Sequence, residues 1–174
     1  MEKTTVRNIA KHIRSTLDIH KLSRLLVKRI RETEEYKAAK TVMLFYPKKF
    51  EIDLTDLIKD INKNFCLPKM IKNELIPCCW TTETKLELSS FKVYEPCNIT
   101  TPTHSIDLII LPGLCADKNR NRLGYGKGCY DKFLIHYEGV TLFPLPDELL
   151  FEQIPTAPHD IKPDIIITPS QIIR

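Results

Sequence analysis

Glycine is concentrated in one short stretch of this sequence, together with basic side chains. Four of the five glycines of the chain lie within residues 113–128, namely Gly113, Gly124, Gly126 and Gly128. Arg122 and Lys127 stand in the same stretch. The backbone N–H groups of a glycine-rich turn can converge on phosphate oxygens, and arginine and lysine add full positive charges. The stretch therefore predicts a phosphate-binding loop.

This glycine loop, residues 113–128, stands between an expected strand and an expected helix. The mostly apolar run Ile106–Leu111 is typical of a buried parallel strand, and Tyr130–His136 can form a helix with Phe133 and Leu134 inward. The glycine spacing is neither G-x-G-x-x-G nor a P-loop, because no Ser or Thr follows Lys127. Spacing alone thus leaves open a surface loop with solvated charges.

The rest of the chain alternates segments of helical and strand periodicity. Strands are expected at Thr41–Tyr46, Phe65–Leu67, Cys78–Thr81, Leu86–Leu88, Val140–Phe143 and Ile165–Thr168, and helices near the N-terminus, at His20–Glu34 and after Asp53. Such alternation predicts an α/β fold with a mostly parallel sheet covered by helices on both faces, a Rossmann-like three-layer architecture. No linker or repeat interrupts it, so we expect one domain spanning residues 1–174.

The elements expected to position the glycine loop converge on one edge of that sheet. In open parallel sheets, ligands bind beyond the carboxyl ends of the strands. Pro47–Glu51, Tyr94–Pro96, the glycine loop and the end near Thr168 all follow candidate strands, so we expect them to share one rim. The first helix adds a basic stripe, of which Lys11 and Arg14 are expected to be a solvated face.

Composition excludes several classes of protein. The net charge of +4, with 43% hydrophobic and 28% charged residues, is that of an ordinary globular domain and falls short of the basic stripe of a nucleic-acid binder. No apolar run approaches the roughly 20 residues of a membrane helix, and Met1–Ala10 has no signal-peptide core. We therefore expect a cytoplasmic protein with no nucleic-acid or membrane partner, a monomer, with six cysteines that are reduced and mostly buried.

A family resemblance rests on the glycine loop and its flanks. The loop reads Leu111-Pro112-Gly113-Leu114, Asp117 and Arg122-Leu123-Gly124-Tyr125-Gly126-Lys127-Gly128-Cys129-Tyr130-Asp131. This run resembles the signature of 5-formyltetrahydrofolate cyclo-ligase, also called methenyltetrahydrofolate synthetase. Flanking features agree in order along essentially the whole chain: Lys3 and Arg7, Glu51-Ile52, Leu67-Pro68, Glu95-Pro96, Glu152-Gln153, Pro155, His159-Asp160 and Thr168.

The resemblance implies that the protein converts ATP and 5-formyltetrahydrofolate, with Mg²⁺, to 5,10-methenyltetrahydrofolate, ADP and phosphate. Ring closure needs N10 to attack the formyl carbon and to expel its oxygen, which is a very poor leaving group. Transfer of the γ-phosphoryl group onto that oxygen lets it depart as phosphate. The protein then contributes positioning and charge neutralisation rather than a nucleophile.

The resemblance also assigns residues to the two substrates. It implies ATP binding by Lys3, Arg7, Arg122, Leu123, Gly124, Tyr125, Gly126, Lys127, Gly128, Cys129 and Tyr130. It implies folate binding by Tyr46, Glu51, Tyr125, Gly126, Lys127, Gly128, Cys129 and Tyr130. The candidate catalytic residues are Arg122 and Lys127. As loop charges are expected to be exposed, replacing either by alanine is expected to reduce turnover severely with little loss of stability.

The implied Mg²⁺ ligands are Asp131 and Asp160, since hard carboxylate oxygens suit that ion. From the residues alone other interpretations stay open. Asp131 could be a helix cap, Tyr46 and Glu51 could be a strand-end tyrosine and an exposed loop carboxylate, and Tyr130 could be a core aromatic. For His159 we favour a polar turn residue beside Asp160.

The sequence departs from the family pattern at four positions. Ala116 and Cys129 replace aromatic residues, Arg120 stands where a turn glycine is common, and Leu54 stands where threonine is common. The two lost aromatics predict a looser folate or nucleotide pocket, while the charged residues are all retained.

Two other classes of function fit the sequence less well. A nucleotide- or RNA-binding module would use the basic loop without catalysis, with steep salt dependence and stacking aromatics. A phosphosugar isomerase-like or acyl-transfer α/β enzyme would need a catalytic carboxylate or nucleophile and no ATP.

Overall fold

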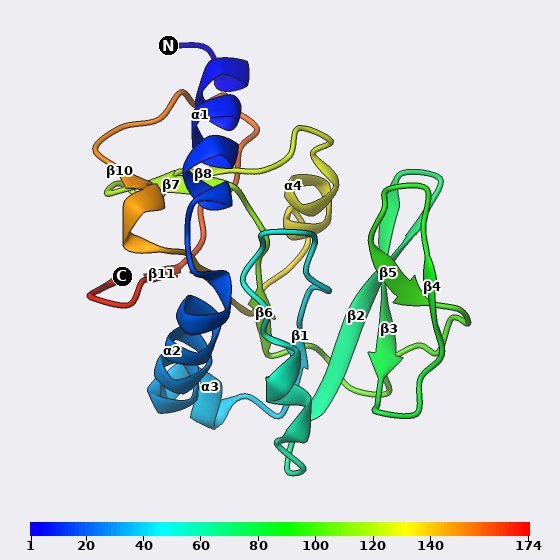
Figure 1. Cartoon of the computed structure of the whole chain (residues 1–174). Helices are drawn as coiled ribbons and strands as arrows, with labels where there is room; N and C mark the ends of the chain where they lie inside the picture. The colour runs from blue at the N-terminus through cyan, green and yellow to red at the C-terminus, as the bar shows by residue number, and fades with distance from the viewer.

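A seven-stranded, mostly parallel sheet forms the centre of the molecule, as the sequence predicts. The computed structural model describes all residues, 1–174. The strand order is β12-β11-β9-β6-β1-β2-β3, with bounds Ile172–Ile173, Ile165–Ile167, Val140–Pro144, Leu108–Ile110, Thr41–Met43, Asn64–Ile71 and Glu74–Trp80. The inner pairs are parallel, and the two edge pairs, β2–β3 and β11–β12, are antiparallel. The α/β class is confirmed (Figure 1).

Alternate side chains of the central strands pack into two separate hydrophobic cores, one on each face of the sheet. In β6, Leu108 and Ile110 belong to one buried cluster while Ile109 belongs to the other, as the two-residue period of a strand requires. The first cluster is closed by α2 (Ile19–Glu32), α3 (Glu34–Ala38) and the 3₁₀ turn η1 (Thr55–Lys59). Helices therefore cover this face.

The second face is covered by helices and also by a small sheet that the sequence did not reveal. The helices are α1 (Lys3–Ser15) and α4 (Cys129–Leu134). The three-stranded sheet β10-β7-β8 consists of Leu150–Phe151, Cys115–Asp117 and Arg122–Leu123, and the 3₁₀ turn η2 (Asp147–Leu149) packs beside it. Strands β7 and β8 of this sheet lie within the glycine loop and hold its first part in place. The rest of the loop, residues 124–128, therefore begins at a fixed strand end.

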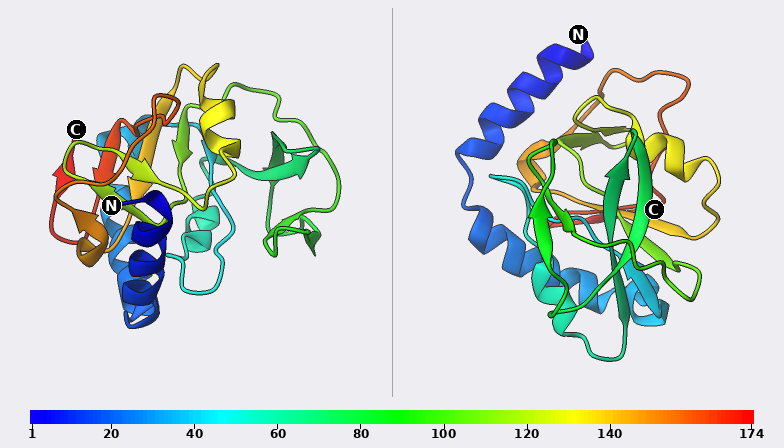
Figure 2. Two further views of the ribbon diagram at one scale, coloured as in Figure 1. Left: turned by 90° about the horizontal axis from the view of Figure 1, so that it is seen from above. Right: turned by 90° about the vertical axis from the view of Figure 1, so that its right-hand side faces the viewer.

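The hairpin β2–β3 and a second hairpin, β4 (Leu86–Leu88) with β5 (Tyr94–Pro96), lie at the end of the molecule away from both termini (Figure 2). The sequence predicted a strand that ends at Leu67, before Pro68, and this is wrong, because β2 continues to Ile71. Pro68 pairs with Pro77 in the β2–β3 register. The N–H of Cys79 donates to the Thr100 carbonyl and therefore points away from β2. Every second residue of a strand points its backbone nitrogen in the same direction, so the nitrogen of Pro77 also points away from β2. The nitrogen of its partner Pro68 in turn points away from β3. No ladder bond is lost there, because neither position needs an N–H.

Two predicted helices are shorter than the periodicity suggested. The segment after Asp53 forms only η1, which ends at Lys59, and Ile61 beyond it is 92% exposed. The helix after the glycine loop ends at Leu134, before the expected His136. None of the helices is long and apolar enough to cross a membrane. All six cysteines are unbonded, with Cys66, Cys78 and Cys115 buried and the other three half-buried.

Asp107 ties the start of β1 to the start of β6. Its Oδ2 accepts hydrogen bonds from the N–H groups of Lys40 (2.8 Å) and Thr41 (2.9 Å). The bond from Thr41, opposed by partial desolvation and reinforced by the bond from Lys40, lowers the pKa of the Asp107 carboxyl below its usual value. A depressed folded-state pKa contributes stability above the unfolded-state pKa and loses it as pH falls through the folded-state value.

We predict that Asp107→Ala lowers the free energy of unfolding by about 1 kcal/mol at pH 7, the typical loss for hydrogen bonds to a charged acceptor at an accessible site. The difference from the unsubstituted protein is expected to shrink below about pH 4, where the unfolded-state carboxyl is protonated. Denaturant unfolding at pH 7 and pH 3 measures it, with Glu138→Ala as an exposed carboxylate control. A difference that stays constant between the two pH values would contradict this role.

Candidate functional site

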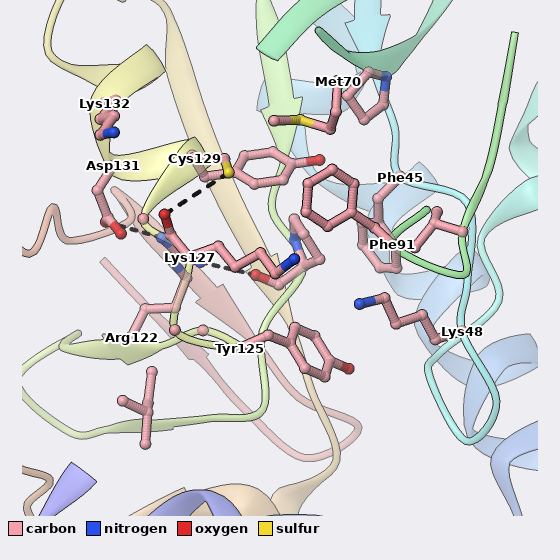
Figure 3. A pocket seen from close by; sticks show the side chains of 18 of the residues that line it. Phe45, Lys48, Met70, Phe91, Arg122, Tyr125, Lys127, Cys129, Asp131 and Lys132 are labelled. Atoms are coloured by element: carbon pink, nitrogen blue, oxygen red, sulfur yellow. Dashed lines mark hydrogen bonds and ion pairs between the residues drawn. The ribbon is translucent and has the colours of Figure 1, made fainter. Parts of the chain in front are cut away.

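Every site residue predicted from the sequence lines one cavity of about 660 Å³. Basic and glycine residues form one part of its wall: Lys3, Arg7 and residues 122–131. Figure 3 shows this side facing a group of apolar and basic residues across the cavity: Phe45, Met70, Phe91 and Lys48. Three of the four segments predicted to share one rim do line the cavity: Pro47–Glu51 through Lys48 and Glu51, Tyr94–Pro96 through Glu95, and the glycine loop through residues 122–128. The prediction is wrong for Thr168, which is fully buried and does not line the cavity.

Helix α1 brings two basic side chains to the glycine loop. Lys3 Nζ donates to Asp160 Oδ2 at 2.5 Å, and Arg7 Nε donates to the Gly124 carbonyl at 3.0 Å. The two residues are one helical turn apart and therefore share a face of α1. Partial burial alone would raise the pKa of Asp160. The pKa nevertheless lies below its usual value, because Lys3 and the Ala157 N–H donate to the carboxylate. Lys3 and Arg7 are therefore held by contacts within the protein rather than by solvent alone.

The glycines of the loop are required at two positions by backbone geometry. Gly126 and Gly128 have φ values of 105° and 66°, a region that L residues rarely adopt. A Cβ atom at Gly126 would lie 3.2 Å from Arg7 Cζ. Helix α4 is only six residues long, so the loop and its basic side chains, rather than a helix terminus, supply the positive end of the cavity.

Arg122 is buried, which corrects the expectation of an exposed loop charge. It is 7% exposed. Its Nη1 donates to the Pro112 carbonyl at 2.9 Å and its Nη2 to Asp131 Oδ1 at 3.0 Å. Lys127 is exposed, as expected, and its Nζ lies 3.6 Å from the centre of the Phe91 ring. The two candidate catalytic cations therefore differ: Arg122 is a buried part of the fold, and Lys127 is held by an aromatic ring at the surface.

A buried carboxylate marks the other part of the cavity. Glu51, 5% exposed, accepts the Tyr125 hydroxyl at Oε1 (2.6 Å) and the Lys48 N–H at Oε2 (2.7 Å). Burial, reinforced by the charge of Glu51, raises the pKa of Tyr125 well above its usual value, so this tyrosine stays a hydrogen-bond donor. The alternative of an exposed loop carboxylate at Glu51 is wrong.

Two further tyrosines line the cavity. Tyr46 packs edge-on against Tyr94, with ring centres 5.3 Å apart. The hydroxyl of Tyr130 is buried and has no hydrogen-bond partner. Burial is also the main reason that the pKa of Tyr130 is raised. A buried hydroxyl without a partner is unfavourable, so Tyr130 offers a polar contact to a bound molecule rather than being only a core aromatic.

The structure adds cavity residues that the sequence did not single out. Phe91 comes from the turn between β4 and β5, and Phe45 and Met70 come from the segments after β1 and within β2. Their sequence neighbourhoods contain no glycine, and only the folding back of the second hairpin brings Phe91 over Lys127. Arg14 was expected to be solvated, and this is wrong: it is 5% exposed, and its Nη2 donates to the Gly113 carbonyl at the start of the glycine loop.

Asp131 and Asp160 each keep one oxygen free of hydrogen bonds. Asp131 Oδ1 accepts from Arg122 and the Ile161 N–H, and Asp160 Oδ2 accepts from Lys3 and the Ala157 N–H. No three acidic, histidine or cysteine side chains gather anywhere in the molecule. The pair therefore fits an ion that takes most of its ligands from phosphate and water, as Mg²⁺ does. His159 is exposed, 3.8 Å from Asp160 Oδ1.

The four departures from the family pattern have different settings. Ala116 and Leu54 are fully buried in the cores and do not line the cavity, so the expected loosening of the pocket at Ala116 is wrong. Arg120 adopts φ of 62°, the conformation that favours a glycine there, and its Nη1 donates to the Asp164 carbonyl at 2.7 Å. Cys129 lines the cavity.

Together, the parallel sheet and this cavity define a small α/β enzyme whose site joins an anion-binding end to an acidic, aromatic end. Residues 3–169 match the model of the 5-formyltetrahydrofolate cyclo-ligase family, and the chain belongs to this family. Membership favours the cyclo-ligase over the RNA-binding and isomerase alternatives.

Individual relatives support this family assignment. The chain is 29% identical over 164 residues to the 5-formyltetrahydrofolate cyclo-ligase of Mus musculus, covering 83% of this chain and 81% of that protein. It is 26% identical over 167 residues to the Haemophilus influenzae cyclo-ligase, covering 91% and 89%. The NMR structure of Aquifex aeolicus 5,10-methenyltetrahydrofolate synthetase superposes with a TM-score of 0.87 at 29% identity, over 100% of this chain and 93% of that one.

We predict that Lys127→Ala lowers turnover about 10²–10³-fold, the usual effect of removing one charge-stabilising donor, without changing the free energy of unfolding. Arg122→Ala is expected to destabilise the fold by roughly 2 kcal/mol or more, because Asp131 and the Pro112 carbonyl lose a buried partner. Denaturant unfolding and steady-state kinetics measure the two effects. Equal stabilities of the two variants would show that Arg122 has no structural role.

We also predict that Gly126→Ala weakens binding of MgATP about tenfold, because the added Cβ would lie 3.2 Å from Arg7 Cζ and would displace the guanidinium, and because it would strain the backbone. Gly128→Ala is the matched variant, since it shares the positive φ but has no atom within 4 Å of the added Cβ. Calorimetric titration of each variant with MgATP measures the difference. The same dissociation constant for both would mean that Arg7 does not hold the nucleotide.

Proposed function

We propose that this protein catalyses the ATP- and Mg²⁺-dependent cyclisation of 5-formyltetrahydrofolate to 5,10-methenyltetrahydrofolate, with release of ADP and phosphate. The formyl oxygen first receives the γ-phosphoryl group of ATP, and ADP leaves. N10 then bonds to the formyl carbon and loses its proton, while the bond from that carbon to the phosphorylated oxygen breaks and releases phosphate, which takes up the proton. Residues 1–174 act as one catalytic domain, and residues from both its N-terminal and its C-terminal parts line the cavity.

The observation that carries the proposal is the joining of two unlike ends in one cavity. Phosphate-binding groups (Lys3, Arg7 and the glycine loop) and a buried carboxylate among aromatic rings line the same space. A phosphoryl transfer between two substrates requires this arrangement, because the terminal phosphorus and the accepting oxygen must meet in line. Two separate clefts would not support it.

At the anionic end, Lys3, Arg7 and Lys127 neutralise the triphosphate. Arg122, fixed by Asp131 and the Pro112 carbonyl, presents its charge at the base of the loop. Asp131 and Asp160 would hold Mg²⁺, which when bound shields the phosphate charge and orients the terminal phosphoryl group. In a cavity that restricts water, such fixed charges stabilise the transferring group more than they would in bulk solvent.

At the other end, Glu51 receives the N–H groups of the pterin. Both of its oxygens already accept one hydrogen bond, and a carboxylate can accept more. Tyr46, Tyr130 and the ring of Phe91 provide aromatic walls, and the unpartnered hydroxyl of Tyr130 adds a polar contact. The monomeric state and cytoplasmic location expected from the sequence stay predictions.

The proposal predicts that near-ultraviolet absorbance of the methenyl product appears only when ATP, Mg²⁺ and 5-formyltetrahydrofolate are all present. Omission of each reactant in turn is the measurement, and Lys127→Ala is the matched control for contaminating activity. Product formation without ATP, or none with folded protein and all three reactants, would contradict the proposed reaction.

A further inference from the structure

Arg14, in the last turn of α1, joins three segments that meet beneath the cavity. Its Nη2 donates to the carbonyls of Gly113 (2.8 Å) and Leu114 (3.0 Å). Its Nη1 lies 3.4 Å from the Tyr125 hydroxyl and 3.9 Å from Glu51 Oε1. The side chain is buried, and its Nε has no partner. A buried guanidinium is unfavourable unless its contacts compensate, so a charge at this place calls for a reason beyond packing.

The direction of the hydrogen bonds supplies that reason. Arginine has donors and no acceptor, so Tyr125 must accept from Arg14. The single hydroxyl proton of Tyr125 is then committed to Glu51, which it reaches at 2.6 Å. Glu51 in turn is fixed from the other side by the Lys48 N–H. The chain Arg14, Tyr125, Glu51 therefore leaves the carboxylate as an acceptor only.

Resting on the proposed function, we propose that Arg14 is a positioning residue of the folate end of the cavity. Through Tyr125 it sets the orientation of Glu51, so that the remaining lone pairs of the carboxylate meet the N–H donors of the pterin. Arg14 does not itself line the cavity, so it acts without touching the substrate. Lys3 and Arg7 of the same helix serve the other substrate.

This division of labour along α1 predicts a selective kinetic effect. Arg14→Met keeps a long side chain and removes the donors. The Michaelis constant for 5-formyltetrahydrofolate is expected to rise about tenfold, as expected for loss of a hydrogen bond to a charged group. The Michaelis constant for ATP and kcat are expected to change by less than about threefold. A general loosening of the glycine loop would instead raise both Michaelis constants together.

A double-mutant cycle with Tyr125→Phe separates positioning from packing. Because the contact of Arg14 with the Tyr125 hydroxyl (3.4 Å) is shorter than its ion pair with Glu51 (3.9 Å), Arg14 acts mainly through Tyr125, and Arg14→Met in the Tyr125→Phe background should raise the Michaelis constant for the folate by less than twofold. Arg29→Met is the matched control: Arg29 is half-buried, its Nε also lacks a partner and its Nη1 donates to the Pro169 carbonyl. It should lower thermal stability without changing either Michaelis constant.

Arg14→Lys covers the case in which Arg14→Met does not fold. It keeps the charge but cannot serve two carbonyls and Tyr125 at once, so the folate constant should still rise, by about threefold. Turnover by the unsubstituted protein is measured first, and its absence would overturn the proposed function itself. With turnover present, additive effects of the two substitutions, equal rises in both Michaelis constants, or an Arg14→Lys variant that matches the unsubstituted protein would overturn the role of Arg14.

Discussion

The site depends on the docking of α1 against the glycine loop by basic side chains. Arg14 holds the carbonyls of Gly113 and Leu114, Arg7 holds the carbonyl of Gly124, and Lys3 holds Asp160. Lys3, Arg7 and Arg14 share one face of the helix, since eleven residues bring a side chain back to within about 20° in a helix of 3.6 residues per turn. One helix face therefore joins the N-terminus to segments more than a hundred residues away (Figure 1).

The same contacts explain why a loop with positive φ angles can be well defined. The small sheet β10-β7-β8 fixes the approach to the loop, α4 follows it directly, and Arg122 ties the base of the loop to Pro112 and Asp131. Between these anchors, Gly126 lets the backbone pass close to Arg7. Glycine permits the close approach of the backbone, and the arginine contacts restrict the conformations that a glycine-rich loop would otherwise sample.

The sequence predicted the layers of the fold and the location of the site because both depend on local signals. Apolar runs identified β6 and β9, and the clustering of glycine identified the loop. It did not predict the small sheet, because β7 and β8 are short, contain charged residues and, unlike β6, are not part of a longer apolar run. It did not predict Phe91 or the burial of Arg14 and Arg122, because these depend on hairpin folding and on distant carbonyl partners. The strand predicted at Phe65–Leu67 stops short of Pro68, because the tolerance of a proline within β2 depends on the register with β3.

The central claim is that one cavity aligns the terminal phosphorus of ATP with the formyl oxygen of the folate. The most direct test follows that oxygen. With 5-formyltetrahydrofolate labelled with ¹⁸O in the formyl group, a single turnover should place the label in inorganic phosphate, detectable by mass spectrometry or by the isotope shift in ³¹P spectra. Label found in water, with unlabelled phosphate, would contradict the account.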